Sequence, residues 1–131
     1  MELSILIPAL NEKYLERTIQ DIKEHAQTDV EILTEEDPGI GQRALTNKLA
    51  SKAKGKYLMK LDAHCSLSQG FDIQMLKDID DNSVIVPSLA KLDVENWRVI
   101  PQPINSNFYL DTNLVFQYAD NKPELVHEVI G

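Results

Sequence analysis

Two side chains that can bind a metal ion, Asp62 and His64, directly follow a short apolar segment at residues 57–61. In an extended backbone, alternate residues project to the same side, so the carboxylate and the imidazole would lie together. These donors suit Mn²⁺ and also accept zinc, whereas Mg²⁺ prefers oxygen ligands alone. The triplet therefore indicates a divalent-cation site. An aspartate that caps the next turn, beside a structural histidine, is the alternative interpretation.

The segments that precede this triplet predict strands alternating with helices. Residues 3–7 are mostly apolar, as in a buried parallel strand, and Pro8 is expected to end that strand. Asn11 is a candidate N-cap for a helix from Lys13 to Ala26, whose apolar residues recur at helical spacing.

The same order then repeats along the chain. A second strand is predicted at Val30–Leu33, an acidic loop at residues 35–39, a helix at residues 41–53 ending before Gly55, and a third strand at residues 57–61. Successive strand–helix–strand units favour an α/β fold with a mainly parallel sheet and right-handed connections.

Beyond the third strand the pattern is weaker. Apolar residues between Phe71 and Ile79 predict another helix after Gly70, and Val84–Val86 predict a fourth strand. A strand at Trp97–Ile100 and a hairpin or edge extension at Phe108–Tyr118 are expected further on.

Polar residues follow each of the first three predicted strands. In an open parallel sheet the ligand crevice lies outside the carboxyl ends of the strands. The candidate segments are residues 8–12, residues 35–37 and residues 62–64. We therefore expect these segments to border one binding site.

Two of these segments resemble a known family. Residues 55–65, Gly-Lys-Tyr-Leu-Met-Lys-Leu-Asp-Ala-His-Cys, resemble the metal-binding segment of glycosyltransferases of the GT-A fold. The Asp-Ala-His-Cys variant is similar to that of the polypeptide N-acetylgalactosaminyltransferases and related family 2 enzymes. Residues 4–12, Ser-Ile-Leu-Ile-Pro-Ala-Leu-Asn-Glu, resemble the start of family 2 chains. The resemblance covers about residues 3–88.

The resemblance implies a GT-A, Rossmann-like sandwich and transfer of a sugar from a nucleotide-diphosphate sugar, with UDP favoured, to an unknown acceptor. It also implies Mn²⁺ or Mg²⁺ at Asp62 and His64. The residues that it places around the nucleoside are Pro8, Ala9, Asn11 and Glu12. An acidic residue after the second strand, Glu36 or alternatively Asp37, would contact the base or ribose, although the family usually has an Asp-Asp pair here.

Arg43 and Asn47 are candidates for binding the diphosphate. They lie one helical turn apart, on a side of their predicted helix that differs from the side of Leu45 and Leu49. Family 2 chains often carry an Arg and an Asn in this helix, and Arg donates well to phosphate oxygens. An exposed Arg without a functional role is the equally weighted alternative.

Length and charge limit the remaining possibilities. The 131 residues suit one domain, in which we expect residues 1–90 to form the nucleotide-binding core and residues 91–131 to begin a truncated acceptor side. A net charge of −8 argues against nucleic acid binding. Without an apolar span, and with a single cysteine, Cys65, we expect a cytosolic protein with a buried structural thiol.

Other functions remain open at this stage. A non-catalytic or truncated nucleotide-binding module would share the same residues, and a second copy or a partner could complete the acceptor side of an active enzyme. A nucleotidyltransferase is disfavoured because residues 8–12 contain no glycine for a phosphate loop. His127 is a less favoured third metal ligand, and no residue is identified as the general base.

Overall fold

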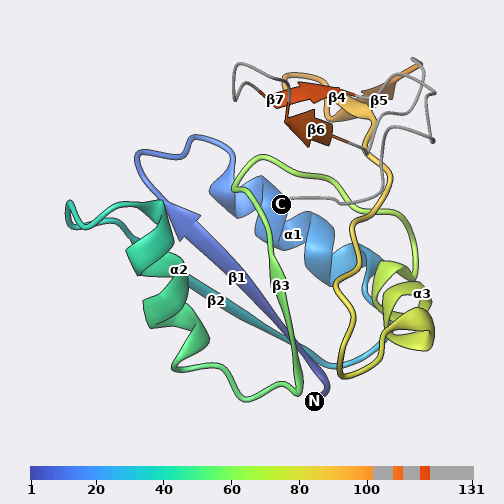
Figure 1. Cartoon of the computed structure of the whole chain (residues 1–131). Coiled ribbons are helices and arrows are strands. Elements are labelled where there is room, and N and C mark those ends of the chain that lie inside the picture. Colours follow the sequence, from blue (N-terminus) through green and yellow to red (C-terminus); the bar gives the residue numbers. More distant parts are fainter. Residues whose placement is uncertain (102–107, 111–115, 119–131) are drawn as a thin grey trace. The chain divides into compact units, whose positions relative to one another are not determined.

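The computed structural model describes residues 1–101, 108–110 and 116–118. The chain divides into unit 1, Met1–Ile79, and unit 2, Asp80–Gly131, and each is described by itself. The expected single domain with a boundary near residue 90 stays a prediction. In unit 1, strands and helices alternate along the chain (Figure 1). They are β1 (Leu3–Ala9), α1 (Leu15–His25), β2 (Val30–Glu36), α2 (Gln42–Ala50), β3 (Tyr57–Lys60) and α3 (Phe71–Asp78).

The sheet of unit 1 has three strands in the order β2-β1-β3, and β1 is parallel to both neighbours. Leu3 is opposite Val30 on one side and Tyr57 on the other, so all three strands run from the same edge. The α/β class and the parallel sheet predicted from the sequence are thereby confirmed.

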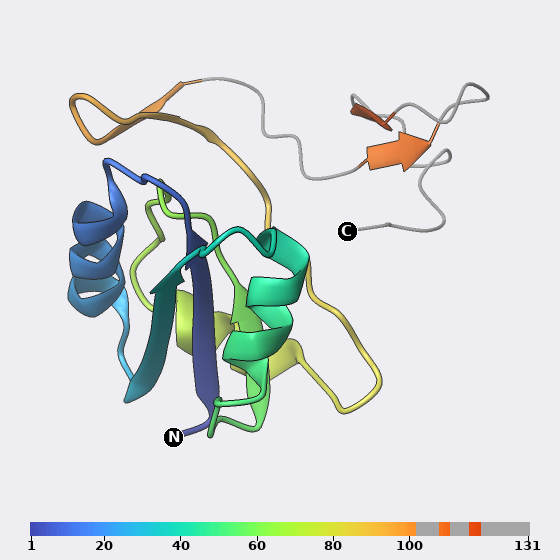
Figure 2. The same ribbon diagram turned by 90° about the vertical axis from the view of Figure 1, so that its left-hand side faces the viewer.

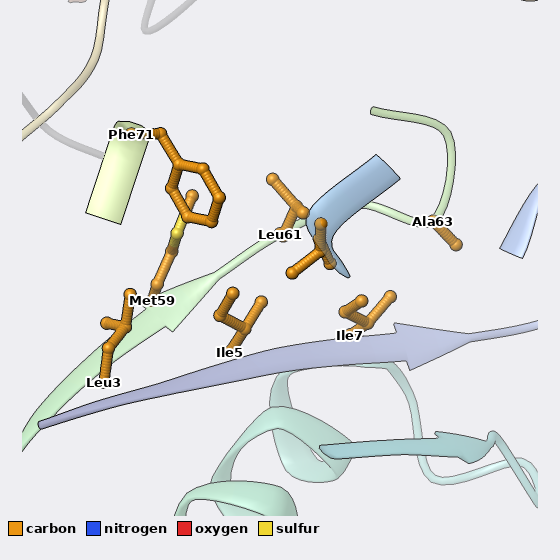
Figure 3. Close-up of a cluster of buried hydrophobic side chains, with 8 residues drawn as sticks. Leu3, Ile5, Ile7, Met59, Leu61, Ala63 and Phe71 are labelled. Atoms are coloured by element: carbon orange, nitrogen blue, oxygen red, sulfur yellow. The ribbon is translucent and has the colours of Figure 1, made fainter. Parts of the chain in front are cut away.

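Helices cover both faces of the central strand. On one face, Ile22 of α1 and Phe71 of α3 join the buried residues of β1 and the β3 segment, several of which appear in Figure 3. On the other face, Leu45 and Leu49 of α2 pack on Leu6. Figure 2 shows α1 and α2 on opposite sides of the sheet. Every residue of β1 is buried as a result.

Pro8 does not end β1, contrary to the prediction. The strand continues through Pro8, opposite Glu35, to Ala9. The carbonyl oxygen of Leu6 accepts a hydrogen bond from the backbone N–H of Leu61, so the backbone polar groups of Leu6 point toward β3. Because these groups point to alternate sides along a strand, those of Pro8, two residues on, point toward β3 as well. Because β3 ends at Lys60, the missing N–H of proline removes no bond between strands.

The predicted boundaries are also wrong around the two loops that follow β1 and β2. β2 continues through Glu35 and Glu36, which were expected in a loop, because it pairs with β1 as far as Ala9. Asn11 is not the N-cap of α1, since that position is Tyr14. Asn11 has φ 52°, a left-handed conformation that asparagine adopts more readily than most residues.

Gly55 was predicted as a helix stop, but α2 ends at Ala50 and the glycine has another function. Its N–H donates to Oγ of Ser4 at 2.8 Å. A Cβ at position 55 would lie 2.7 Å from both N and Oγ of Ser4, which is closer than packing permits. Glycine thus allows the β3 segment to approach β1.

Unit 2 contains short antiparallel pairs. β4 (Lys91–Asp93) pairs with β5 (Arg98–Ile100), and β6 (Phe108–Leu110) pairs with β7 (Phe116–Tyr118). The strand expected at Trp97–Ile100 is present as β5, and the antiparallel pairing of β6 with β7 agrees with the hairpin, one of the two arrangements expected at Phe108–Tyr118. The fourth strand predicted at Val84–Val86 is wrong: this stretch has no strand pairing, and Val84 is 91% exposed. A run of three β-branched residues has strand propensity, but propensity alone supplies no pairing partner.

No helix in the described ranges is long and apolar enough to cross a membrane.

A buried carboxylate, Asp72 at the start of α3, holds the loop between α1 and β2. It accepts hydrogen bonds from the backbone N–H groups of Gln27 and Thr28 and from the Thr28 hydroxyl, at 2.6 to 3.1 Å. Burial by itself raises the pKa of Asp72, but these hydrogen bonds outweigh it and hold the pKa below its ordinary value.

We expect Ile22→Ala to destabilise unit 1 strongly. Ile22 of α1 is fully buried in the same core cluster as Ile5, Ile7 and Phe71, and truncation of such a side chain costs about 2–5 kcal/mol through lost burial and a cavity. Urea unfolding followed by circular dichroism measures the change. Val84→Ala is the matched control, since it shortens an exposed β-branched side chain and should stay within about 0.5 kcal/mol.

Asp72 should make the free energy of unfolding depend on pH in the acidic range. A carboxylate whose pKa is lowered by folding stabilises the protein above the pKa of the unfolded chain, and this stability is lost as pH falls through the folded pKa. Asp72→Asn should therefore be less stable than wild type near pH 7, and the difference in urea midpoint should shrink at about pH 3. A difference that is the same at both values of pH would contradict this.

Candidate functional site

The carboxyl ends of β1, β2 and β3 lie at one edge of the sheet because the strands are parallel and β1 is between the others. Beyond the strands, the backbone N–H of Asp37 still donates to the carbonyl of Ala9 at 2.7 Å. This pairing draws the segment after β2 against the segment after β1. Pro8 and Ala9 are buried here, and Leu10 and Asn11 directly after them are exposed.

The Asp62–His64 segment keeps the alternation predicted from the sequence. Leu61 and Ala63 are buried in the core on the α1 side of the sheet, as Figure 3 shows. The side chains of Asp62 and His64 are 48% and 53% exposed. Two potential metal ligands thus face away from the core on the same segment.

Each of these side chains has a charged neighbour. Lys60 Nζ forms an ion pair with the carboxylate of Asp62. His64 Nδ1 lies 3.7 Å from Oε2 of Glu12, in the loop after β1. The structure thereby brings together one residue from each of the two segments that carry the family resemblance.

Glu36 is next to the same loop. Its Oε1 accepts a hydrogen bond from the backbone N–H of Asn11 at 2.8 Å. This contact joins the end of β2 to the turn in which Asn11 is left-handed. Of the two acidic candidates after β2, Glu36 is thus the one that touches the β1 loop through its side chain.

Asp37, the alternative, binds its own loop. Its carboxylate accepts hydrogen bonds from the backbone N–H groups of Gly39, Ile40 and Gly41. Gly39 and Gly41 have φ values of 111° and 88°, which glycine adopts without strain. Asp37 therefore shapes the entry into α2, a role that the sequence analysis did not assign to it.

Glu35 faces α2 instead of the strand ends. Its carboxylate pairs with the ammonium groups of Lys48 and Lys52. The hydrogen bond from Lys48, followed by that from Lys52, lowers the pKa of Glu35. Glu35 thus connects β2 to α2.

Arg43 and Asn47 are exposed on α2, while Leu45 and Leu49 on the same helix are buried. The predicted separation of these two pairs of residues is confirmed. Binding of a diphosphate by Arg43 and Asn47 stays a prediction.

Two buried polar residues of α1, Thr18 and Asp21, were not among the predicted site residues but hold the segment following His64. The Oγ1 of Thr18 accepts a hydrogen bond from the backbone N–H of Cys65 at 3.1 Å. The carboxylate of Asp21 accepts from Ser66 Oγ at 2.8 Å and from the N–H of Leu67 at 2.7 Å. Their spacing in the sequence could have identified them, because Thr18 and Asp21 lie on the same buried side of the helix as Ile22.

Cys65 is half-buried within this segment. Burial raises the pKa of its thiol, and the negative charge of Asp62 raises it further. Both effects disfavour the thiolate, the form in which a cysteine acts as a nucleophile.

The donor set at the strand ends fits a divalent cation only in part. Asp62 and His64 offer a carboxylate and an imidazole, which Mn²⁺ accepts together. Among the described residues, no cluster of at least three His, Cys, Asp or Glu side chains could hold a metal ion. A cation at Asp62 and His64 would then take its remaining ligands from a bound molecule or water. His127 lies outside the described residues.

Comparison with known proteins gives no match: no family model fits the chain, and no curated protein or solved structure is significantly similar to it.

Cys65 should react slowly with alkylating agents in the folded protein. Its thiol is half-buried and its raised pKa leaves little thiolate near neutral pH. We expect iodoacetamide to modify the native protein at least about tenfold more slowly than the urea-unfolded chain, measured by mass spectrometry at one pH. Since the chain has one cysteine, each modified molecule reports this position. Equal rates would show that the segment around Cys65 is open.

Proposed function

We propose that unit 1 is the donor-binding part of a metal-dependent glycosyltransferase of the GT-A fold. In this proposal it binds a nucleotide-diphosphate sugar, with UDP favoured, at the carboxyl ends of β1, β2 and β3. The observation that carries the proposal is the approach of His64 to Glu12 at 3.7 Å. Each of these residues comes from one of the two separate segments that resemble family 2 glycosyltransferases.

The parallel sheet supplies a second line of support. It puts the segments after all three strands at one edge, which is where open α/β sheets bind ligands. At this edge, Glu36 and Asn11 are joined by a hydrogen bond, so the residues proposed for the nucleoside form one continuous border.

In the proposed site, Asp62 and His64 hold the cation and Lys60 is the nearby positive charge. A bound Mn²⁺ or Mg²⁺ would neutralise the negative charge that grows on the leaving nucleoside diphosphate. Glu36 accepts hydrogen bonds from the base or ribose, and Arg43 donates to phosphate oxygens. Pro8 and Ala9 provide a buried, rigid floor under the nucleoside.

The test is calorimetric titration of UDP into the purified protein with Mn²⁺ and with EDTA. We expect binding that requires the metal and that weakens at least about tenfold in Asp62→Ala and in His64→Ala, because each substitution removes a ligand. Asp78→Ala is the charge-matched control, since Asp78 is exposed at the end of α3 and its loss should not change the affinity.

Absence of UDP binding by folded wild type, or equal binding with EDTA, would overturn the donor assignment. Release of sugar from UDP-sugars, measured in parallel, separates an enzyme from a module that only binds the nucleotide. Binding without any turnover would favour the non-catalytic module.

A further inference from the structure

Helix α1 presents a pair of buried polar side chains to the segment that follows His64. Thr18 is fully buried and Asp21 is 1% exposed. They lie one helical turn apart, so both face the same side of α1. Their acceptor oxygens bind the backbone of Cys65 and Leu67 and the hydroxyl of Ser66. We call residues 65–67 the clamped segment.

The carboxylate of Asp21 and the clamped segment depend on each other. A carboxylate at such depth is costly unless hydrogen bonds satisfy its oxygens. The clamped segment supplies an N–H donor to Oδ1 and a hydroxyl donor to Oδ2. His25 also contributes, because its Nδ1 lies 3.1 Å from Oδ1 and 2.9 Å from the carbonyl oxygen of Asp21. Both oxygens only accept, so Nδ1 carries the hydrogen.

The clamp has a geometric consequence for the candidate site. Before Asp62, the chain is fixed by the hydrogen bond from the N–H of Leu61 to the carbonyl of Leu6. After His64, it is fixed by α1. Asp62 and His64 therefore lie between two anchored points, with exposed side chains.

The same helix connects to the β1 loop. Glu12 lies three residues before the start of α1 at Leu15, and its carboxylate is the neighbour of His64. Since an α-helix is stiff over its length, a clamp on Thr18 and Asp21 relates the position of His64 to that of the loop containing Glu12.

We propose that Asp21 is a positioning residue for the cation and nucleotide site. Through the clamped segment it fixes where His64 and Asp62 stand relative to Glu12. It touches neither nucleotide nor metal in this proposal. The link to nucleotide affinity rests on the proposed function, whereas the clamp itself does not.

The deciding variant is Asp21→Asn. Asparagine has nearly the same shape but carries no charge, so the charge-assisted hydrogen bonds that Asp21 accepts from Ser66 and Leu67 become weaker neutral ones. Asp72→Asn is the matched control. Asp72 is equally buried and accepts backbone and hydroxyl hydrogen bonds, but from Gln27 and Thr28, on the loop that enters the sheet at the opposite ends of the strands.

The first readout is amide hydrogen exchange, which needs no ligand. In Asp21→Asn the N–H of Leu67 should exchange at least about tenfold faster than in wild type, while the N–H of Thr28 keeps its protection. Asp72→Asn should show the reverse pattern. Unchanged protection of Leu67 in folded Asp21→Asn would overturn the clamp, whatever ligand the protein binds.

The second readout is the affinity for UDP with Mn²⁺. We expect about a tenfold loss in Asp21→Asn, which is typical when a group that orients metal ligands is lost, and a change within about twofold in Asp72→Asn. Equal losses in both variants would show that Asp21 acts through general stability alone and would overturn the positioning role. If wild type binds no UDP, the proposed function fails, and hydrogen exchange still decides the clamp.

Ser66→Ala is the variant to measure if Asp21→Asn does not fold. This variant removes the hydroxyl donor and leaves the bond between Leu67 and Asp21. It should change Leu67 exchange and UDP affinity in the same direction by a smaller factor. No change in either quantity in a folded Ser66→Ala, together with an unfolded Asp21→Asn, would count against the proposal.

Discussion

The parallel pairing of β1 with both neighbours is the constraint on which the rest of unit 1 depends. All of β1 is buried. Its side chains pack against helices on both faces of the sheet, while its backbone forms hydrogen bonds with two strands. The two neighbouring strands end at different positions along β1: β3 stops opposite Leu6, and β2 continues to Ala9. This stagger creates the edge at which the three loops meet.

Polar groups inside the structure then fix the loops around that frame. Asp72 holds the loop between α1 and β2, and Asp21 holds the segment after β3. Glu31 links Ser4 to the backbone of Lys54 before β3, and Gly55 permits the close approach there. Three carboxylates therefore anchor connecting segments of unit 1.

Apolar patterns in the sequence were sufficient to predict the elements of unit 1. The three helices follow from the helical spacing of apolar residues, and the three strands follow from short apolar runs. The predicted ends of the strands were wrong where pairing with a neighbouring strand determines them. Pro8 continues β1 because its nitrogen faces past the end of β3, and Glu36 belongs to β2 because Ala9 pairs with it. Val84–Val86 has the composition of a strand but lacks a pairing partner, which composition cannot supply.

At the candidate site, the sequence predicted which loops meet, since parallel strands bring their carboxyl ends together. It did not predict that Glu36 binds the N–H of Asn11 or that Asp37 binds its own loop, because adjacent acidic residues are equivalent until the backbone orients them. Asp21 was missed for a different reason: a charged residue in a helix is usually solvated, and its burial depends on donors from a segment far along the chain.

Asn11 carries a wider consequence for recognising such chains. Its φ of 52° restricts position 11 to the few residue types that accept a left-handed backbone. That restriction comes from the turn after β1 and is independent of any reaction. A substitution at position 11 that keeps this turn is therefore favoured only for aspartate or glycine. Asparagine at position 11 thus reports the course of the backbone after β1, and by itself it indicates no reaction.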